Sequence, residues 1–318
     1  MTKKFNVLTL GDALITMNPV TKGPMRYVTH FERKAGGAEL NFAIGVARLG
    51  LESKWISRLG EDEFGKVIYN FARGEGVDVS DVQFVKEYPT SLNFKEIKED
   101  GSGRTFYYRS NSPTNTFVME DITDDLFTSI DIVHLTGVFL SLDKKNLALV
   151  MKVIEKAKEN NITISFDPNI RLKLWTIDDA RETFKEIFPH VDILLTGLDE
   201  LELFLEEDSE DSFTKFANDY NIKDLIIKDG ENGSKLYRDG VWTKADAFNV
   251  DVVDTVGAGD GFAAGYIYGY LHKYSPEELL RIANGVGALV TTVSGDNEGL
   301  PYIDEVKAFV NNKGIVER

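Results

Sequence analysis

Short apolar runs alternate with helix-forming segments along most of the chain, and this alternation restricts the possible folds more than any other feature of the sequence. Strands are predicted at 5–10, 54–58, 132–136, 162–166, 191–195, 225–228 and 234–238. Helices are predicted at about 39–49 and 62–75, after the N-cap candidates Ser141 and Thr176, over the acidic segment 198–208, from a glycine-rich turn to about Tyr274, and after Ser275. A chain of this pattern forms a largely parallel sheet with right-handed crossovers. We therefore predict the α/β class, with a doubly wound, mostly parallel sheet flanked by helices.

Two segments interrupt the alternation. Residues 13–35 contain proline and glycine and lack helical periodicity. Residues 90–98 and 104–109 alternate in polarity on either side of a glycine-containing turn, which predicts a β-hairpin. We expect about 13–35 and 88–112 to form a small β-sheet lid over the site, within a single α/β domain at 1–318.

Composition excludes several classes of partner. The 36 Lys and Arg residues against 52 Asp and Glu give a formal charge of -16, which argues against nucleic acid and anionic membranes as partners. Cysteine is absent, so disulfides, a thiolate nucleophile and a zinc–thiolate site are excluded. The sequence has no apolar run of the ~18 residues that a membrane span needs, and its N-terminus enters a strand without a signal-peptide core. The predicted location is the cytoplasm.

The segment VVDTVGAGDGFAAG at 252–265 is the strongest candidate for chemistry. It reads as an extended apolar lead-in, a tight turn of Gly257, Ala258 and Gly259, and then Asp260 at the start of a helix. Free N–H groups and roughly half a positive charge at a helix N-terminus favour an anion there. An aspartate beside such a site would repel a static phosphate but suits a base that deprotonates an attacking hydroxyl. The alternative is an ordinary glycine-rich turn capped by aspartate.

A second glycine motif favours the catalytic interpretation of 252–265 over the ordinary turn. The segment AGGAELN at 35–41, with Gly36, Gly37 and Asn41, leads into a helix. Together with 252–265 it resembles the two signature stretches of the ribokinase-like (PfkB) carbohydrate kinases, and the resemblance runs nearly from end to end of the chain. It implies a ribokinase-like fold with a lid, homo-oligomer formation through that lid, and an ATP-dependent kinase.

The same resemblance assigns roles to individual residues. Asp260 becomes the catalytic base, with Gly257, Ala258 and Gly259 holding the phosphoryl group in transit. Gly36, Gly37 and Asn41 are expected to contact the sugar. Asp12 follows the first strand, at the sheet edge where ligands bind in open α/β folds, and the family uses this aspartate to hydrogen-bond substrate hydroxyls. The alternatives are a plain turn residue for Asp12 and a loop-to-helix junction for the glycine pair.

Two arginines bear on the substrate. Arg109 follows the second predicted lid strand and Arg171 follows a core strand, so both are expected to face the cleft. Two cations in an acidic protein favour an anionic substrate, because arginine pairs with a carboxylate through two parallel hydrogen bonds. The segments RTFYYR and DPNIRLKLW resemble those of the sugar-acid branch of the family, which implies that Tyr107, Arg109 and Arg171 bind the carboxylate and keto end. The alternative for each arginine is a surface ion pair.

Two positions depart from the pattern. The sugar-acid branch usually has a tyrosine where this chain has Asn93, which leaves the exact sugar acid open. Many family members have an asparagine three residues before the glutamate that corresponds to Glu200, and this chain has Gly197 there. That departure weakens a ribokinase or fructokinase interpretation more than kinase activity.

ATP is expected across the carboxyl end of the sheet. By the resemblance, its binding residues are Lys228, Gly230, Gly233, Gly257, Gly259 and Asn284. Lys228 could instead be a strand-end charge, and Asn284 a contact between helices. Mg²⁺ would arrive with the nucleotide, held by phosphates and water, with Glu200 acting through a water. Asp254 resembles part of a monovalent-cation loop, and whether such a cation binds here stays open.

The leading hypothesis is an ATP-dependent kinase of 2-keto-3-deoxygluconate that phosphorylates the C6 hydroxyl. A fructokinase or another neutral-sugar kinase, and a phosphosugar kinase, are alternatives within the same family. A non-catalytic sugar-acid sensor is an alternative of a different class, although a binder has no need of a base such as Asp260.

Overall fold

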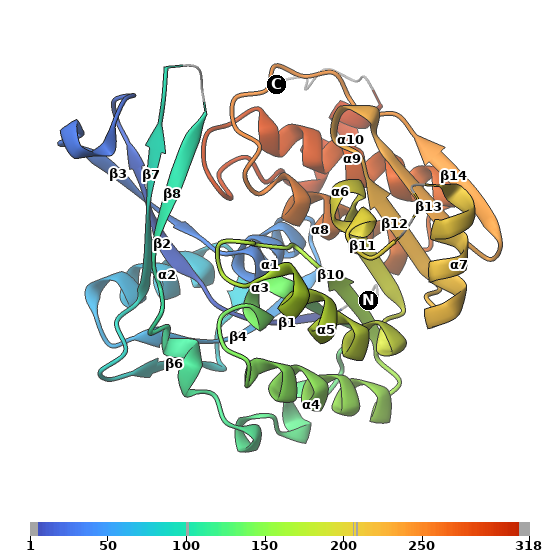
Figure 1. Ribbon diagram of the computed structural model, residues 1–318, viewed down its shortest axis with the longest axis horizontal. Coiled ribbons are helices and arrows are strands. Elements are labelled where there is room, and N and C mark those ends of the chain that lie inside the picture. The colour runs from blue at the N-terminus through green and yellow to red at the C-terminus, as the bar shows by residue number, and fades with distance from the viewer. Residues whose placement is uncertain (1–5, 100–101, 206, 208, 312–318) are drawn as a thin grey trace.

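The computed structural model describes residues 6–99, 102–205, 207 and 209–311, and these form two sheets (Figure 1). The larger sheet has ten strands in the described residues, in the order β14-β13-β12-β11-β10-β9-β1-β4-β5, with β6 paired to β4. Its strands are β1 (Asn6–Leu10), β4 (Glu52–Gly60), β5 (Val77–Asp78), β6 (Val82–Val85), β9 (Ile132–Thr136), β10 (Thr163–Asp167), β11 (Ile193–Gly197), β12 (Asp224–Lys228), β13 (Ser234–Arg238) and β14 (Val241–Ala245). Within the described part of this sheet, the antiparallel pairings are the two made by β13, and the others are parallel. The predicted mostly parallel sheet is confirmed.

Helices cover both faces of this sheet because successive strand residues point to opposite sides. Leu8 packs in a cluster with α4 (Asn146–Glu159) and α5 (Ile177–Ile187). Its neighbour Val7 packs in a cluster with α1 (Ala38–Arg48), α8 (Ala258–Leu271) and α9 (Pro276–Thr291). The helices are α1 (Ala38–Arg48), α2 (Glu63–Gly74), α3 (Gly137–Leu140), α4 (Asn146–Glu159), α5 (Ile177–Ile187), α6 (Leu198–Glu202), α7 (Glu210–Tyr220), α8 (Ala258–Leu271), α9 (Pro276–Thr291) and α10 (Ile303–Val310). The predicted doubly wound arrangement is therefore also confirmed.

A separate four-stranded sheet, called the small sheet below, projects beside α1 and α2 (Figure 1). Its order is β3-β2-β7-β8, from β2 (Leu14–Pro19), β3 (Phe31–Gly36), β7 (Ser91–Ile97) and β8 (Gly103–Tyr108). The two predicted segments thus pair with each other, through parallel strands β2 and β7. Residue 5 of the predicted first strand, residues 100–101 of the predicted hairpin turn, and positions 206 and 208 of the acidic segment lie outside the described residues.

Local signals at helix starts were mostly correct. The Thr176 side chain accepts a hydrogen bond from the N–H of Asp179, and Ser275 forms the expected capping box with Glu278. The assignment of Ser141 as an N-cap is wrong. Its hydroxyl donates to the carbonyl of Val138 at 2.6 Å and closes α3, and the next helix begins only at Asn146.

None of the helices in the described residues has both the length and the apolar character to cross a membrane.

Candidate active site

The anion site, residues 257–259, lies at the start of α8. Gly257 is the N-cap and has φ +79°, a conformation that glycine adopts without strain. A Cβ on Gly257 would lie 2.0 Å from the carbonyl oxygen of Asp296, so no larger residue fits. The N–H of Ala258 donates to the carbonyl of Thr255 at 3.3 Å. A helix leaves the N–H groups of its first turn without intrahelical partners, so Gly259 and Asp260 present donors at this point.

Asp260 lies in the first turn of α8 with 9% of its surface exposed. Its Oδ2 accepts a hydrogen bond from Nδ2 of Asn41 at 2.8 Å, and its Oδ1 accepts a longer one from Nδ2 of Asn169 at 3.4 Å. Burial raises the pKa of the Asp260 carboxyl to about 7, although the hydrogen bond from Asn41 and the charges of Arg171 and Lys228 act in the opposite direction. A carboxyl with this pKa accepts a proton readily near neutral pH.

The glycine pair places α1 against this carboxylate. Gly37 has φ +135° and is the N-cap of α1, and a Cβ there would lie 2.7 Å from the carbonyl oxygen of Asp12. A Cβ on Gly36 would lie 2.2 Å from Oδ2 of Asp296. The backbone of the first motif is therefore in close contact with both the Asp12 loop and the Asp296 loop. One turn into α1, the same motif places Asn41 against Asp260.

Asp12 is fully buried and has three hydrogen-bond donors. Arg109 donates to its Oδ2 at 2.7 Å, Ser91 to the same oxygen at 3.3 Å, and Ser112 to Oδ1 at 2.9 Å. The structure therefore pairs two predicted substrate residues with each other and joins the end of β1 to the small sheet. Nε of Arg109 is buried without a partner in the described residues.

Tyr107 and Arg171 occupy different surroundings. The Arg109 guanidinium lies 5.7 Å from the ring centre of Tyr107, which holds the ring beside the charged pair. Arg171 is exposed in the loop after β10, and its charge is close enough to Asp260 to lower the pKa of that carboxyl. Asn93, which departs from the resembled pattern, is 5% exposed on β7, and its Oδ1 has no partner in the described residues.

Lys228 belongs to a charged cluster that sequence reasoning did not identify. Its Nζ lies 2.6 Å from Oδ2 of Asp167 at the end of β10, and 3.7 Å from the position of a Cβ on Gly259. Burial lowers the pKa of the Lys228 ammonium, but the charges of Asp167 and Glu200 outweigh that effect and raise it above its ordinary value. The anion site therefore has a permanent cation beside it.

Glu200 borders the same cluster. Its two carboxylate oxygens accept from the N–H groups of Ile170 at 2.7 Å and Gly197 at 3.0 Å. Burial and then the Asp167 charge raise the pKa of this carboxyl. Each oxygen keeps a lone pair for water, which fits indirect contact with a metal that enters on a nucleotide.

A dedicated metal centre is not present in the described part of the chain, which has no group of three or more His, Cys, Asp or Glu residues able to hold an ion. Asp254 accepts from the N–H of Val256 at 3.1 Å and from that of Gly295 at 3.4 Å, so it ties two loops together.

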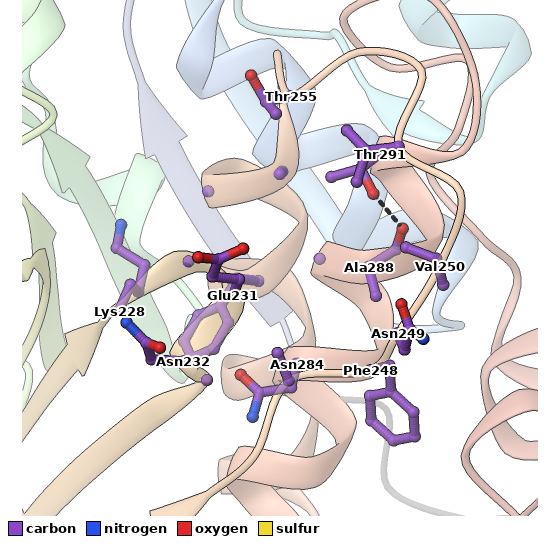
Figure 2. A pocket seen from close by; sticks show the side chains of 18 residues that line it. Lys228, Glu231, Asn232, Phe248, Asn249, Val250, Thr255, Asn284, Ala288 and Thr291 are labelled. Atoms are coloured by element: carbon purple, nitrogen blue, oxygen red, sulfur yellow. Dashed lines mark hydrogen bonds between the residues drawn. The ribbon is translucent and has the colours of Figure 1, made fainter.

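A cavity of about 870 Å³ opens beside the anion site. Figure 2 shows Lys228 and Asn232 on one side of it, and Phe248, Asn249 and Val250 on the other. The predicted nucleotide residues that line it are Lys228, Gly230, Gly233, Gly259 and Asn284. Sequence reasoning missed the apolar and polar wall of 247–250, because that segment has no regular structure and no motif.

Asn284 lines the cavity, but its amide is already occupied. Its Oδ1 accepts from Ser234 at 2.9 Å, and its Nδ2 donates to the carbonyls of Ala245 at 3.2 Å and Asp246 at 3.1 Å. The side chain therefore joins α9 to the end of β14. These hydrogen bonds support a structural role for Asn284.

Glu39 is a buried carboxyl that the sequence did not single out. It is fully buried, accepts a hydrogen bond from Thr136 at 2.5 Å, and has no partner for Oε2 in the described residues. A Cβ on Gly11 would lie 2.2 Å from its Cδ, so the side chain is pressed against the chain that leads into Asp12. Burial raises the pKa of Glu39 to about 7.

Glu39→Gln should therefore change how stability depends on pH. The folded protein holds this proton between the ordinary carboxyl pKa and about 7, and the unfolded chain does not, so ionisation of Glu39 costs stability as pH rises through that window. We expect the unfolding free energy of the variant, relative to the parent, to improve by about 3 kcal/mol between about pH 4 and pH 8 in urea titrations. Glu32→Gln, at an exposed position of β3, is the matched control. A pH-independent difference for Glu39→Gln would contradict this account.

Known carbohydrate kinases are similar to this chain over most of its length. A family model described as pfkB family carbohydrate kinase matches residues 4–303. A 2-dehydro-3-deoxygluconokinase of Thermoproteus tenax is 36% identical over 310 residues, which cover 96% of this chain and 94% of the relative. A probable fructokinase-2 of Arabidopsis thaliana is 31% identical, covering 96% of this chain and 95% of the relative. The structure of a putative Ribokinase II from E. coli in complex with ATP and Mg²⁺ superposes with a TM-score of 0.90 at 24% identity, over 97% of this chain and 99% of that one.

Proposed function

The chain belongs to the pfkB family of carbohydrate kinases, and on that premise we propose that this sugar kinase transfers the γ-phosphoryl group of ATP to the C6 hydroxyl of 2-keto-3-deoxygluconate. The Thermoproteus relative is named as a kinase of the same sugar acid, under the synonym 2-dehydro-3-deoxygluconate. One observation carries the catalytic part of the proposal. Asp260 is an almost buried carboxylate with the pKa of a base, and it lies in the helix turn that would hold the phosphoryl group.

The nucleotide is proposed to occupy the cavity of about 870 Å³ that Lys228 and Gly259 line. The related E. coli structure contains ATP and Mg²⁺, and we propose the same donor here. The γ-phosphoryl group then meets the N–H groups at the start of α8 and the Lys228 ammonium, which stabilise the negative charge of the transition state. Mg²⁺ bound to the nucleotide would supply further charge neutralisation, with Glu200 placed to hold one of its waters.

The chemical step needs only one proton acceptor. The C6 oxygen forms a bond to the γ-phosphorus while the bond from that phosphorus to the bridging oxygen of ADP breaks, and the hydroxyl proton passes to Asp260. Asp12 and Asn41 are proposed to orient the acceptor through its hydroxyls. The ionised form of Asp260 is active, so the acidic side of the pH profile reports this carboxyl.

Acid recognition is proposed to depend on Arg171, with Tyr107 and Arg109 at the other side of the acceptor. Arg171 is exposed and has its charge near Asp260. Arg109 is committed to Asp12 at 2.7 Å. Its Nε has no hydrogen-bond partner in the described residues, but it is buried and therefore out of reach of a ligand oxygen in this conformation.

The Asp12–Arg109 pair is also the specific observation that favours a second candidate. An arginine neutralised by a protein carboxylate attracts an anionic substrate less than a free one, and the Arabidopsis relative is a probable fructokinase. A neutral-sugar kinase is therefore the main alternative, followed by a phosphosugar kinase.

ADP release measured with 2-keto-3-deoxygluconate, fructose, ribose and a fructose phosphate separates these candidates. We expect the highest kcat/KM with the acid. Turnover of fructose without turnover of the acid would reject the proposed substrate and keep the kinase. Binding of the acid without ADP release under any condition would favour a sensor.

Arg171→Ala should raise KM for the acid by about 10-fold to 100-fold and leave KM for a neutral sugar nearly unchanged, because it removes a charge-assisted hydrogen bond to the carboxylate. Arg181→Ala removes the same charge from the surface of α5, where Arg181 bonds the carbonyl of Leu203, and serves as the matched control. Equal increases in KM for the acid and the neutral sugar would contradict the carboxylate assignment.

We also propose that the small sheet acts as a lid within one domain at 1–318, built from 13–35 and 88–112. The hydrogen bonds from Arg109 and Ser91 to Asp12 support this, because they attach the sheet to the acceptor side of the site. We also propose that homo-oligomers form through the lid segments, where Tyr27, between β2 and β3, is 74% exposed and Tyr108, at the end of β8, is 60% exposed.

A further inference from the structure

The loop between α9 and α10 places a fully buried asparagine against the first glycine motif. Asn297 has no exposed surface, and its Nδ2 donates to the carbonyl oxygen of Ala35 at 2.8 Å and to Oδ1 of Asn41 at 3.2 Å. Ala35 directly precedes the glycine pair, and Asn41 is the donor to Asp260. Neither sequence motif contains Asn297, and none of the roles assigned so far uses it.

The direction of these hydrogen bonds follows from one backbone group. The carbonyl of Ala35 can only accept, so the Asn297 amide must present its N–H₂ end to it. The second hydrogen of that group points to Asn41, which must therefore accept through Oδ1. The other end of the Asn41 amide is then its Nδ2, and this N–H faces Oδ2 of Asp260. The carboxylate is left as an acceptor at the end of the series.

We propose that Asn297 is a positioning residue of the phosphoryl-transfer site, which fixes the side-chain amide of Asn41 so that its N–H, and not its carbonyl oxygen, faces Asp260. The inference rests on the proposed role of Asp260 as the base. An N–H in this place stabilises the ionised carboxylate that takes the proton. A carbonyl oxygen there would repel that form and favour the protonated carboxyl, which cannot act as a base.

Other groups around Asp260 do not replace this arrangement. Asn169 donates only at 3.4 Å. The charged groups near the carboxyl are Asp167 at the end of β10, Arg171 in the following loop and Lys228 at the end of β12. None of these three is a hydrogen-bond partner of Asn41 in the described residues, so removal of the Asn297 side chain leaves their charges in place.

The loop backbone has its own anchors, which makes a substitution at 297 informative. Arg48 donates to the carbonyl oxygens of Asn297 at 3.0 Å and Leu300 at 2.7 Å, and it pairs with Glu75 at 2.7 Å. Asp296 pairs with Lys95 at 2.9 Å. Loss of the Asn297 side chain therefore frees the Asn41 amide while these bonds hold the loop.

The test is a double-mutant cycle of Asn297→Ala and Asn41→Ala, with kcat followed across pH for whichever acceptor the parent phosphorylates. We expect Asn297→Ala to move the acidic limb of the profile of kcat against pH to higher pH by about one unit, which lowers kcat roughly fivefold at pH 7. In the Asn41→Ala background the second substitution should change neither kcat nor the limb, because Asn297 acts through Asn41.

A structural effect is separated by two further variants. Asn297→Leu fills a similar volume without donors and should shift the limb as Asn297→Ala does, even if the alanine variant folds poorly. Asn146→Ala is the matched control. Like Asn297, Asn146 is fully buried, donates to a backbone carbonyl and has an Oδ1 with no partner in the described residues, but it lies at the start of α4. It should lower the melting temperature and leave the limb in place.

An acidic limb unchanged in both Asn297 variants, or effects that multiply in the double mutant, would overturn the inference. Failure of the underlying proposal gives a different result. If Asp260→Asn retains parental turnover, the base assignment is wrong. If Asp260→Asn is inactive and the two asparagine effects are independent, only the positioning role is wrong.

Discussion

Asp260→Asn is expected to lower turnover by ~10²-fold or more while the protein still binds acceptor and nucleotide. The substitution keeps the size of the side chain and removes only its ability to take a proton, and the anion site at the start of α8 is unchanged. ADP release gives the turnover, and calorimetric titration gives acceptor affinity. Asp251→Asn makes the same chemical change at an exposed position in the loop before α8 and should keep parental turnover.

The pH profile adds a second reading of the same residue. Because burial raises the pKa of Asp260 to about 7 and the ionised form is the base, parental turnover should rise with pH through that value. The residual turnover of Asp260→Asn should lack this limb. Near-parental turnover in the variant, or a limb that survives the substitution, would contradict the role of Asp260.

Arg109→Met is expected to give the largest loss of stability, about 3 to 5 kcal/mol in urea unfolding, together with loss of acceptor binding. Asp12 is fully buried, and Arg109 is its only charged partner among the described residues. Without the guanidinium, a buried carboxylate keeps only the hydroxyls of Ser91 and Ser112. The substitution also removes the stronger of the two hydrogen bonds that join Asp12, after the end of β1, to the small sheet, and leaves the longer one from Ser91.

The partner substitution makes this prediction specific. Adding Asp12→Asn to Arg109→Met removes the unpaired charge, so it should recover part of the lost stability and none of the activity. Arg33→Met, at an exposed position of β3 in the same small sheet, is the control for removal of one arginine. A double mutant no more stable than Arg109→Met would show that the charge of Asp12 is not what destabilises the variant.

The fold was largely predictable because its information is local. Apolar runs marked most core strands, and Thr176 and Ser275 marked helix starts through hydrogen bonds to residues three positions away. Ser141 failed because a serine can equally bond backward to a carbonyl, as it does to Val138. The valines of 252–256 predict an extended apolar lead-in, but no strand forms there, and Val252 and Val253 are more than half exposed.

The site was predictable only where a motif contains it. Asp260, Asn41 and the glycines lie in two short motifs, and the structure brings these together. Asp167 and Asn297 were missed because their partners are distant in sequence: Lys228 is 61 positions from Asp167, and Asn41 is 256 positions from Asn297. No periodicity encodes such contacts. The sequence predicts for Arg109 either a substrate contact or a surface ion pair, and the structure instead shows a buried ion pair with Asp12, which is 97 positions away.

The position of Asp296 has a consequence for redesign and for natural variation. Its side chain fills the space beside Gly36, its carbonyl fills the space beside Gly257, and Lys95 holds it from the small sheet. The glycine turns at Gly36, on the acceptor side, and at Gly257, on the nucleotide side, are therefore both in contact with Asp296. A bulkier residue on the acceptor side would displace Asp296 and so change the turn on the nucleotide side as well. Substitutions that broaden the range of accepted sugars should therefore raise KM for the nucleotide. In natural variants of this enzyme, residues of the two turns should change together.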